Sequence, residues 1–132
     1  GLSNTSKEIE PPSKIDLKDA ITQWANVGGL ISGLYREDYQ LISNSLVDII
    51  VEPYRKKLIP HFDEVKNAAI KSGALGAGIS GSGPTIFALC KGDEDANKVH
   101  SAINESYKNT GIEYTLFTSK INDKGIKILE SN

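Results

Sequence analysis

The 132-residue sequence contains no methionine and a single cysteine, Cys90. Because no methionine is present, Gly1 is not where translation began, and we expect a processed product, a tagged product or a piece of a longer protein. One cysteine excludes an internal disulfide framework and a cysteine-rich zinc site. Cys90 lies at the end of an apolar run, which predicts a small buried side chain rather than a nucleophile.

The chain also lacks an excess of positive charge and a long apolar segment. Lys and Arg together number 15 and Asp and Glu 17, so the formal net charge is −2. This balance argues against non-specific electrostatic binding to nucleic acid or anionic lipid. No apolar run approaches the roughly 20 residues of a membrane helix, and no signal-peptide pattern opens the chain. We therefore expect a cytoplasmic protein with neither a nucleic acid nor a membrane as partner.

What is present describes one foldable domain. Hydrophobic residues make up 39% and charged residues 24% of the chain, which is typical of a soluble globular domain. Residues 1–14 are polar and contain Pro11-Pro12, which predicts a lead-in or linker. The domain itself is expected over residues 15–132.

The first helix is predicted from an apolar face after a capping box. Ser13 and Asp16 have the spacing of that box. The face beyond it repeats every three or four residues; its members are Leu17, Ile21, Trp24, Gly28, Ile31 and Tyr35. Gly28-Gly29 inside the helix predicts close approach of another backbone, with a hinge or a ligand contact as the alternative.

Three further helices and a helical turn follow. A second apolar stripe runs from Ile42 to Ile50, and Pro53 is expected to end its helix near Val51. A helical turn is expected over residues 54–58. Pro60 suits the first position of a third helix that closes at residues 72–73. The fourth helix begins at Asp93 and stops before residue 111.

The remaining segments predict strands. Residues 85–90 form a continuous apolar run, which suits an inner strand covered on both faces. Residues 113–121 alternate in part, a turn follows at 122–125, and 126–129 form a short final strand. This order of elements predicts an α+β fold in which an antiparallel sheet has helices packed on one face.

The most informative segment is residues 73–83, which contains five glycines. A Gly-x-Gly-x-x-Gly pattern lies between residues 76 and 81, but it runs into a strand, whereas a dinucleotide fingerprint opens a helix. In Ser80, Gly81, Ser82 and Gly83 the backbone N–H groups and two hydroxyls can approach a phosphate or a carboxylate closely. The alternative is a tight hairpin whose glycines only allow close packing.

A second candidate is Arg55 in the sequence Glu52-Pro53-Tyr54-Arg55. Proline fixes the backbone just ahead of this arginine, and a guanidinium held in place can bind a carboxylate or phosphate through two parallel hydrogen bonds. The alternative is a surface arginine paired with Glu52 or Glu64.

These segments resemble a known family. The stretch Gly-Ala-Leu-Gly-Ala-Gly-Ile-Ser-Gly-Ser-Gly-Pro-Thr-Ile-Phe-Ala-Leu, residues 73–89, is similar to the third glycine-rich motif of the GHMP kinases. Residues 48–62, with their Glu-Pro-Tyr-Arg element, and residues 23–31 are similar to the homoserine kinases within that superfamily. The resemblance covers about residues 15–130.

The resemblance implies a ferredoxin-like, split βαβ C-terminal domain and a role in moving the γ-phosphoryl group of ATP to the hydroxyl of L-homoserine in threonine biosynthesis. It implies that Arg55 clamps the homoserine carboxylate, that residues 80–83 line the floor of the site, and that Asn26 lies nearby. It also implies ATP and Mg²⁺ as cofactors and a homodimer as a possible assembly.

The family's ATP loop, Pro-x-x-x-Gly-Leu-x-Ser-Ser-Ala, is not found in the 132 residues. The resemblance therefore implies a C-terminal fragment that binds no cofactor alone and is inactive alone. Two other hypotheses stay open at this point. One is the C-terminal domain of another GHMP kinase, and the other is a free-standing α+β module that binds a small anion.

Overall fold

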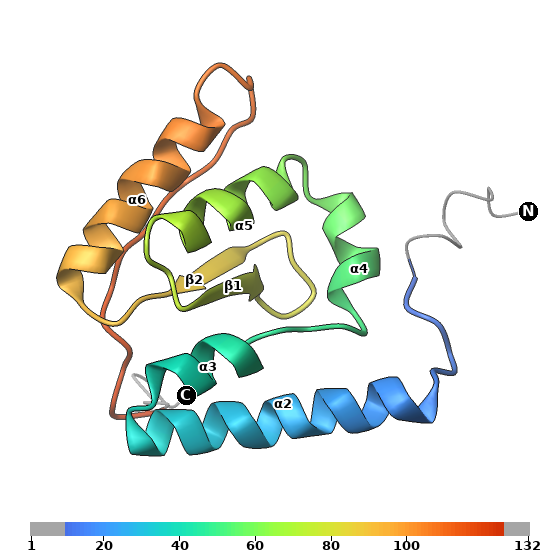
Figure 1. The fold of residues 1–132 in the computed structure, drawn as a ribbon. Coiled ribbons are helices and arrows are strands. Elements are labelled where there is room, and N and C mark those ends of the chain that lie inside the picture. The colour runs from blue at the N-terminus through green and yellow to red at the C-terminus, as the bar shows by residue number, and fades with distance from the viewer. Residues whose placement is uncertain (1–9, 126–132) are drawn as a thin grey trace, which may run out of the picture.

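The computed structural model describes residues 10–125 (Figure 1). The predicted strand over residues 126–129 lies outside this range. The elements along the chain are α2 (Leu17–Arg36), α3 (Tyr39–Ser45), α4 (Glu52–Arg55), the 3₁₀ helix η1 (Lys56–Leu58), α5 (Phe62–Lys71), β1 (Gly76–Ile79), β2 (Ile86–Leu89) and α6 (Asp93–Tyr107). The fold is α+β, as predicted, and the two strands pair antiparallel in the register Gly76 with Leu89 and Ile79 with Ile86.

The main core lies between the hairpin, α5 and α6, which Figure 1 shows stacked on one side of the strands. Its buried members are small or β-branched side chains: Val65, Ala69, Ala74, Ala77, Val99 and Ile103. Cys90 packs against this cluster, but it is partly buried rather than buried as predicted. The predicted end of α5 is also confirmed, because Ser72 is its C-cap and Gly73 follows with φ +113°.

The glycines of β1 determine what lies against its other face. Ala77 points into the core, so Gly76 and Gly78 point away from it. A Cβ atom on Gly76 would lie 2.9 Å from the Cβ of Leu46, and one on Gly78 would lie 3.1 Å from Glu52 Oε2. The strand therefore carries no side chains here because the segment between α3 and α4 occupies the space.

Two helix boundaries differ from the prediction. The first helix begins at Leu17 with Asp16 as N-cap and no side-chain cap hydrogen bond, so the capping box at Ser13 was wrong. The second helix ends at Ser45 rather than near Val51. The Asp48 carboxylate accepts hydrogen bonds from the following backbone, and this local pairing competes with continued helix.

The start of α5 also differs. His61, in a left-handed conformation at φ 65°, is its N-cap, so Pro60 precedes the helix rather than opening it. The His61 ring packs toward α6, where its Nε2 lies 2.8 Å from the carbonyl oxygen of Ser106.

The strand predicted over residues 85–90 is present as β2, but its predicted cover on both faces is wrong, and so is the strand predicted over residues 113–121. Residues 113–121 form no strand but run along α6, where the Tyr114 ring stacks on Tyr107 at 4.2 Å and Thr118 bonds to His100. The strand β2 is not covered on both faces, since Phe87 is 37% exposed. The alternating side chains of residues 113–121 therefore pack on helix α6, and the segment does not pair as a strand with β1 or β2.

The first helix buries a different face from the one its apolar pattern predicts. Trp24 and Tyr35 on that pattern are 65% and 89% exposed, and no atom lies within 4 Å of a Cβ built on Gly28. The close approaches occur at Gly29, against Ser45, and at Gly33, against the backbone of Ile42. The predicted close approach of another backbone at Gly28 was therefore wrong. At Gly29 a close neighbour is present, but it is the side chain of Ser45 and not a backbone. Within residues 10–125, no helix is both long and apolar enough to cross a membrane.

Candidate anion site at α4 and the glycine turn

Arg55 ends a helix of only four residues, α4. So short a helix is not stable by itself, because nucleation fixes several residues for a single hydrogen bond. The direction of Arg55 must therefore come from contacts that the segment around α4 makes with the rest of the domain.

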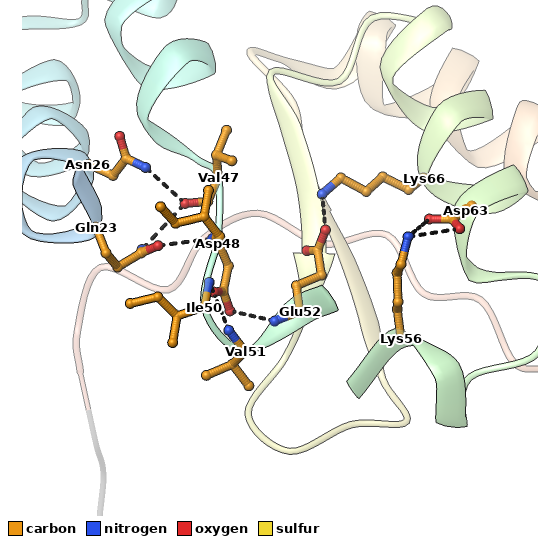
Figure 2. Close-up of polar contacts among 11 residues, drawn as sticks. Gln23, Asn26, Val47, Asp48, Ile50, Val51, Glu52, Lys56, Asp63 and Lys66 are labelled. Carbon is orange, nitrogen blue, oxygen red and sulfur yellow. Dashed lines mark hydrogen bonds and ion pairs between the residues drawn. The ribbon is translucent and has the colours of Figure 1, made fainter. Parts of the chain in front are cut away.

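The first of these contacts is made by a carboxylate in the turn that leads into α4 (Figure 2). The Asp48 carboxylate accepts hydrogen bonds from the N–H groups of Ile50, Val51 and Glu52 at 2.9, 2.8 and 3.2 Å. A carboxylate at this position satisfies donors that a helix N-terminus leaves unpaired and interacts favourably with the helix dipole. Asp48 thus defines where α4 begins.

Two side chains of α2 fix the segment before that turn. The Gln23 side chain accepts from the N–H of Ile49 at 3.0 Å and donates to the carbonyl of Val47 at 3.3 Å. The amide nitrogen of Asn26 donates to the same carbonyl at 3.2 Å (Figure 2). Asn26, predicted as a site residue, therefore helps to hold the segment before α4 in place. It also lines a cavity of about 150 Å³ together with Gly78.

A buried ion pair joins α4 to α5. Glu52 of α4 binds Lys66 of α5, and their side chains are only 13% and 19% exposed (Figure 2). A second and more exposed pair joins Lys56 to Asp63 at 2.9 Å. Because these residues lie at both ends of the α4 turn, the two pairs hold it against α5 from either side.

Arg55 itself has no hydrogen bond or ion pair within residues 10–125, and its side chain is partly buried. The pairing that sequence reasoning offered as the alternative is not formed. Glu52 binds Lys66, and Glu64 lies 3.6 Å from His61. A guanidinium without a protein partner, on a backbone segment that other contacts hold, is available to bind an anion from solution.

The glycine turn between β1 and β2 lies beside this arginine's segment. The turn is closed by the N–H of Ser80 donating to Thr85 at 2.8 Å, and Gly81 has φ +60°. A Cβ on Gly83 would lie 3.3 Å from Ile59, the residue that follows η1. Figure 1 shows the turn next to α4.

The donors of this turn face solvent. Ser80, Gly81 and Ser82 are exposed, and the N–H groups of Gly81 and Ser82 donate no hydrogen bond within residues 10–125. The structure therefore brings the predicted residues 80–83 and Arg55 to one end of the hairpin. Asn26, on α2, shares its cavity with Ile79, the residue just before the turn, and with Glu52 of α4.

Comparison with known proteins shows which family the chain belongs to. The family described as GHMP kinases C terminal matches residues 30–109. The chain belongs to the GHMP kinase C-terminal family. A homoserine kinase of Chlorobium phaeobacteroides is 46% identical over 120 residues, which are 89% of this chain and 38% of that protein. A homoserine kinase of Pyrococcus abyssi is 38% identical over 109 residues, which are 83% of this chain and 36% of that protein.

A solved structure agrees with this placement. The crystal structure of homoserine kinase from Cytophaga hutchinsonii superimposes with a TM-score of 0.72 at 47% identity, covering 81% of this chain and 33% of that one. The chain thus spans about a third of the length of these relatives. The predicted fold of a GHMP kinase C-terminal domain is confirmed.

Sequence reasoning missed the residues that support Arg55 in this GHMP kinase domain. These are Gln23, Asp48 and Lys66, which are distant from each other in sequence. An aspartate whose carboxylate can bind backbone N–H groups two and three residues later is a local turn signal that would have located Asp48. No local signal predicts that Lys66 pairs with Glu52, since the pair spans 14 residues.

The metal implied by the family finds no ligand set in the described part of this domain. No group of three or more His, Cys, Asp or Glu side chains within residues 10–125 is arranged to hold a metal ion.

Proposed function

We propose that this GHMP kinase domain binds the acceptor in a homoserine kinase, which transfers the γ-phosphoryl group of ATP to the hydroxyl of L-homoserine in threonine biosynthesis. The observation that carries the proposal is the unpaired guanidinium of Arg55 beside a turn whose donors face solvent. The names of the relatives, all homoserine kinases, support the choice of substrate.

In this proposal Arg55 binds the homoserine carboxylate through two parallel hydrogen bonds. The exposed N–H groups of Gly81 and Ser82 and the serine hydroxyls bind anionic oxygens near the reacting hydroxyl. Phosphoryl transfer depends mainly on positioning and on stabilising negative charge, so such donors contribute directly to the rate. Asn26 acts indirectly, through the segment before α4.

We further propose that ATP and Mg²⁺ are bound mainly by parts of the enzyme outside these 132 residues. The relatives are much longer than the chain, and the sequence contains no ATP loop of the family type. The 132-residue chain is then expected to release no ADP from ATP with homoserine present.

The test uses the product of the complete open reading frame that contains this sequence. ADP release is measured against L-homoserine concentration for the wild type, Arg55→Ala and the control Arg36→Ala, which removes an exposed arginine at the end of α2. We expect Arg55→Ala to raise KM for homoserine about 30- to 100-fold, as loss of a charged hydrogen-bonded partner does. KM for ATP should stay within about twofold of the wild type.

Two results would overturn the proposal. One is an unchanged homoserine KM in Arg55→Ala. The other is a wild-type protein that phosphorylates a different alcohol, such as mevalonate, in preference to homoserine. ADP release by the isolated 132-residue chain would overturn only the assignment of ATP binding to other parts of the enzyme.

A further inference from the structure

The carboxylate best placed in sequence to neutralise Arg55 is Glu52. The two residues stand three apart in α4, a spacing at which oppositely charged side chains on a helix readily pair. Such a pair would occupy the guanidinium and compete with any carboxylate from solution. In the structure Glu52 turns away from this pairing and binds Lys66 instead.

The surroundings hold Glu52 in its inward position. Its backbone N–H is bound by Asp48 at 3.2 Å, and its Oε2 occupies the space that a side chain on Gly78 would need. The side chain is 13% exposed, so water compensates little of its charge. Lys66, anchored in α5, supplies the compensating charge.

We infer that Lys66 is a positioning residue: by binding Glu52 it keeps Arg55 unpaired and open to an anion. The role assigned to Arg55 toward homoserine rests on the proposed function, whereas the competition between Lys66 and Arg55 for Glu52 does not. Removing the lysine leaves a largely buried carboxylate without its cation. Arg55, one helical turn away, is then the nearby cation without a partner among the described residues, since Lys56 is already bound to Asp63.

The first test measures the reactivity of Arg55 in the 132-residue chain. Phenylglyoxal modifies arginines that are free of ion pairs, and mass spectrometry quantifies it at Arg55 and at the chain's only other arginine, Arg36. Arg36 lies exposed at the end of α2 and serves as the internal reference. We expect Lys66→Met to lower the ratio of Arg55 to Arg36 modification at least about threefold, because an ion pair protects a guanidinium.

Two control variants and one rescue variant accompany this measurement. Lys66→Arg keeps the charge and should preserve the ratio. Lys98→Met makes the same substitution in an exposed pair with Glu94 on α6 and should also preserve it. The double variant Glu52→Gln/Lys66→Met removes the freed carboxylate and should restore the wild-type ratio. An unchanged ratio in Lys66→Met overturns the inference, and so does a higher ratio, which is what an unfolded chain would give.

The second test measures the consequence for the complete enzyme. Lys66→Met should raise KM for homoserine about tenfold while kcat and KM for ATP stay within about twofold, and Glu52→Gln/Lys66→Met should recover most of that loss. A purely structural role would lower the melting temperature and the active fraction without this pattern of recovery. If Arg55→Ala raises KM but Lys66→Met changes neither KM nor the ratio, the positioning role is wrong. If Arg55→Ala leaves KM for homoserine unchanged, the proposed function is wrong. The ratio of Arg55 to Arg36 modification then decides alone whether Lys66 keeps Arg55 unpaired.

Discussion

At the scale of single residues, the glycines differ in what surrounds them. Gly76 in β1 has Leu46 against it, and a Cβ there would lie 2.9 Å from both Cβ and Cγ of that leucine. Gly28 in α2 has open space around it. The sequence pattern marks both simply as small residues, so only the fold shows which of them packing requires.

Alanine at these two positions should have opposite effects. Gly76→Ala should lower the free energy of unfolding by about 1–3 kcal/mol, because the methyl group overlaps Leu46 in a packed site. Gly28→Ala should raise it by about 0.5–1 kcal/mol, because alanine restricts the unfolded chain and favours helix. Urea unfolding followed by circular dichroism measures both, and equal effects of the two substitutions would contradict the packing described for β1.

The thiol of Cys90 offers a pH-dependent check on its environment. Burial, with a smaller contribution from the Asp95 carboxylate, raises the pKa of Cys90. A raised pKa means that the folded protein favours the neutral thiol, so it holds less of the reactive thiolate at pH 8 than the unfolded chain does. The rate of alkylation by iodoacetamide should therefore reach its midpoint at higher pH in native protein than in urea. Asp95→Asn should move the native midpoint downward, and a native midpoint below that in urea would contradict the structure.

At the scale of elements, sequence patterns located the helices better than their ends. The periodic apolar positions predicted α2, α5 and α6, and all three are present. The end of α3 was missed because Asp48 binds backbone N–H groups locally, which an apolar stripe does not reveal. The segment 113–121 was misassigned because contacts with α6, through Tyr107 and His100, satisfy its alternating side chains.

The start of α4 should depend on the Asp48 carboxylate. Asp48→Ala leaves the N–H groups of Ile50, Val51 and Glu52 without their acceptor. We expect the free energy of unfolding to fall by about 1–2 kcal/mol, as on loss of a strong helix cap. Hydrogen exchange should rise at residues 50–55 while staying unchanged in α6. Uniform loss of protection across the domain would instead show that Asp48 supports the whole fold.

At the scale of the whole molecule, an apolar stripe on α2 faces solvent. It includes Ile21, Trp24, Ile31 and Tyr35, each at least 50% exposed. Large exposed apolar patches on soluble proteins commonly mark interaction surfaces. The pattern predicted the helix correctly, but a single sequence cannot show whether such a stripe is buried within its own domain.

The chain's single tryptophan reports on this stripe. Trp24 is 65% exposed, so the dilute isolated chain should emit at long wavelength and be quenched strongly by acrylamide. Emission at short wavelength in a dilute, monomeric sample would contradict an exposed stripe. A shift to shorter wavelength only as the protein is concentrated, with a doubled mass in light scattering, would show that a second copy covers the stripe, in the homodimer that the family resemblance gives as a possible assembly.

The site was predicted in part from sequence. Arg55 and residues 80–83 were singled out because proline rigidity and a glycine-rich turn are local signals. Two features could not be predicted: that Arg55 lies near residues 80–83, and that Arg55 has no ion-pair partner within residues 10–125. Both depend on contacts between residues distant in sequence, such as Ile59 with Gly83 and Lys66 with Glu52.

The central claim is that Arg55 recognises the carboxylate of the acceptor. The most direct measurement compares L-homoserine with 3-aminopropan-1-ol, which keeps the amine and the hydroxyl but lacks the carboxylate, in the complete wild-type enzyme and in Arg55→Ala. The account predicts that Arg55→Ala lowers kcat/KM for homoserine about 30- to 100-fold and that for the amino alcohol less than about threefold. Equal losses for the two acceptors would contradict it.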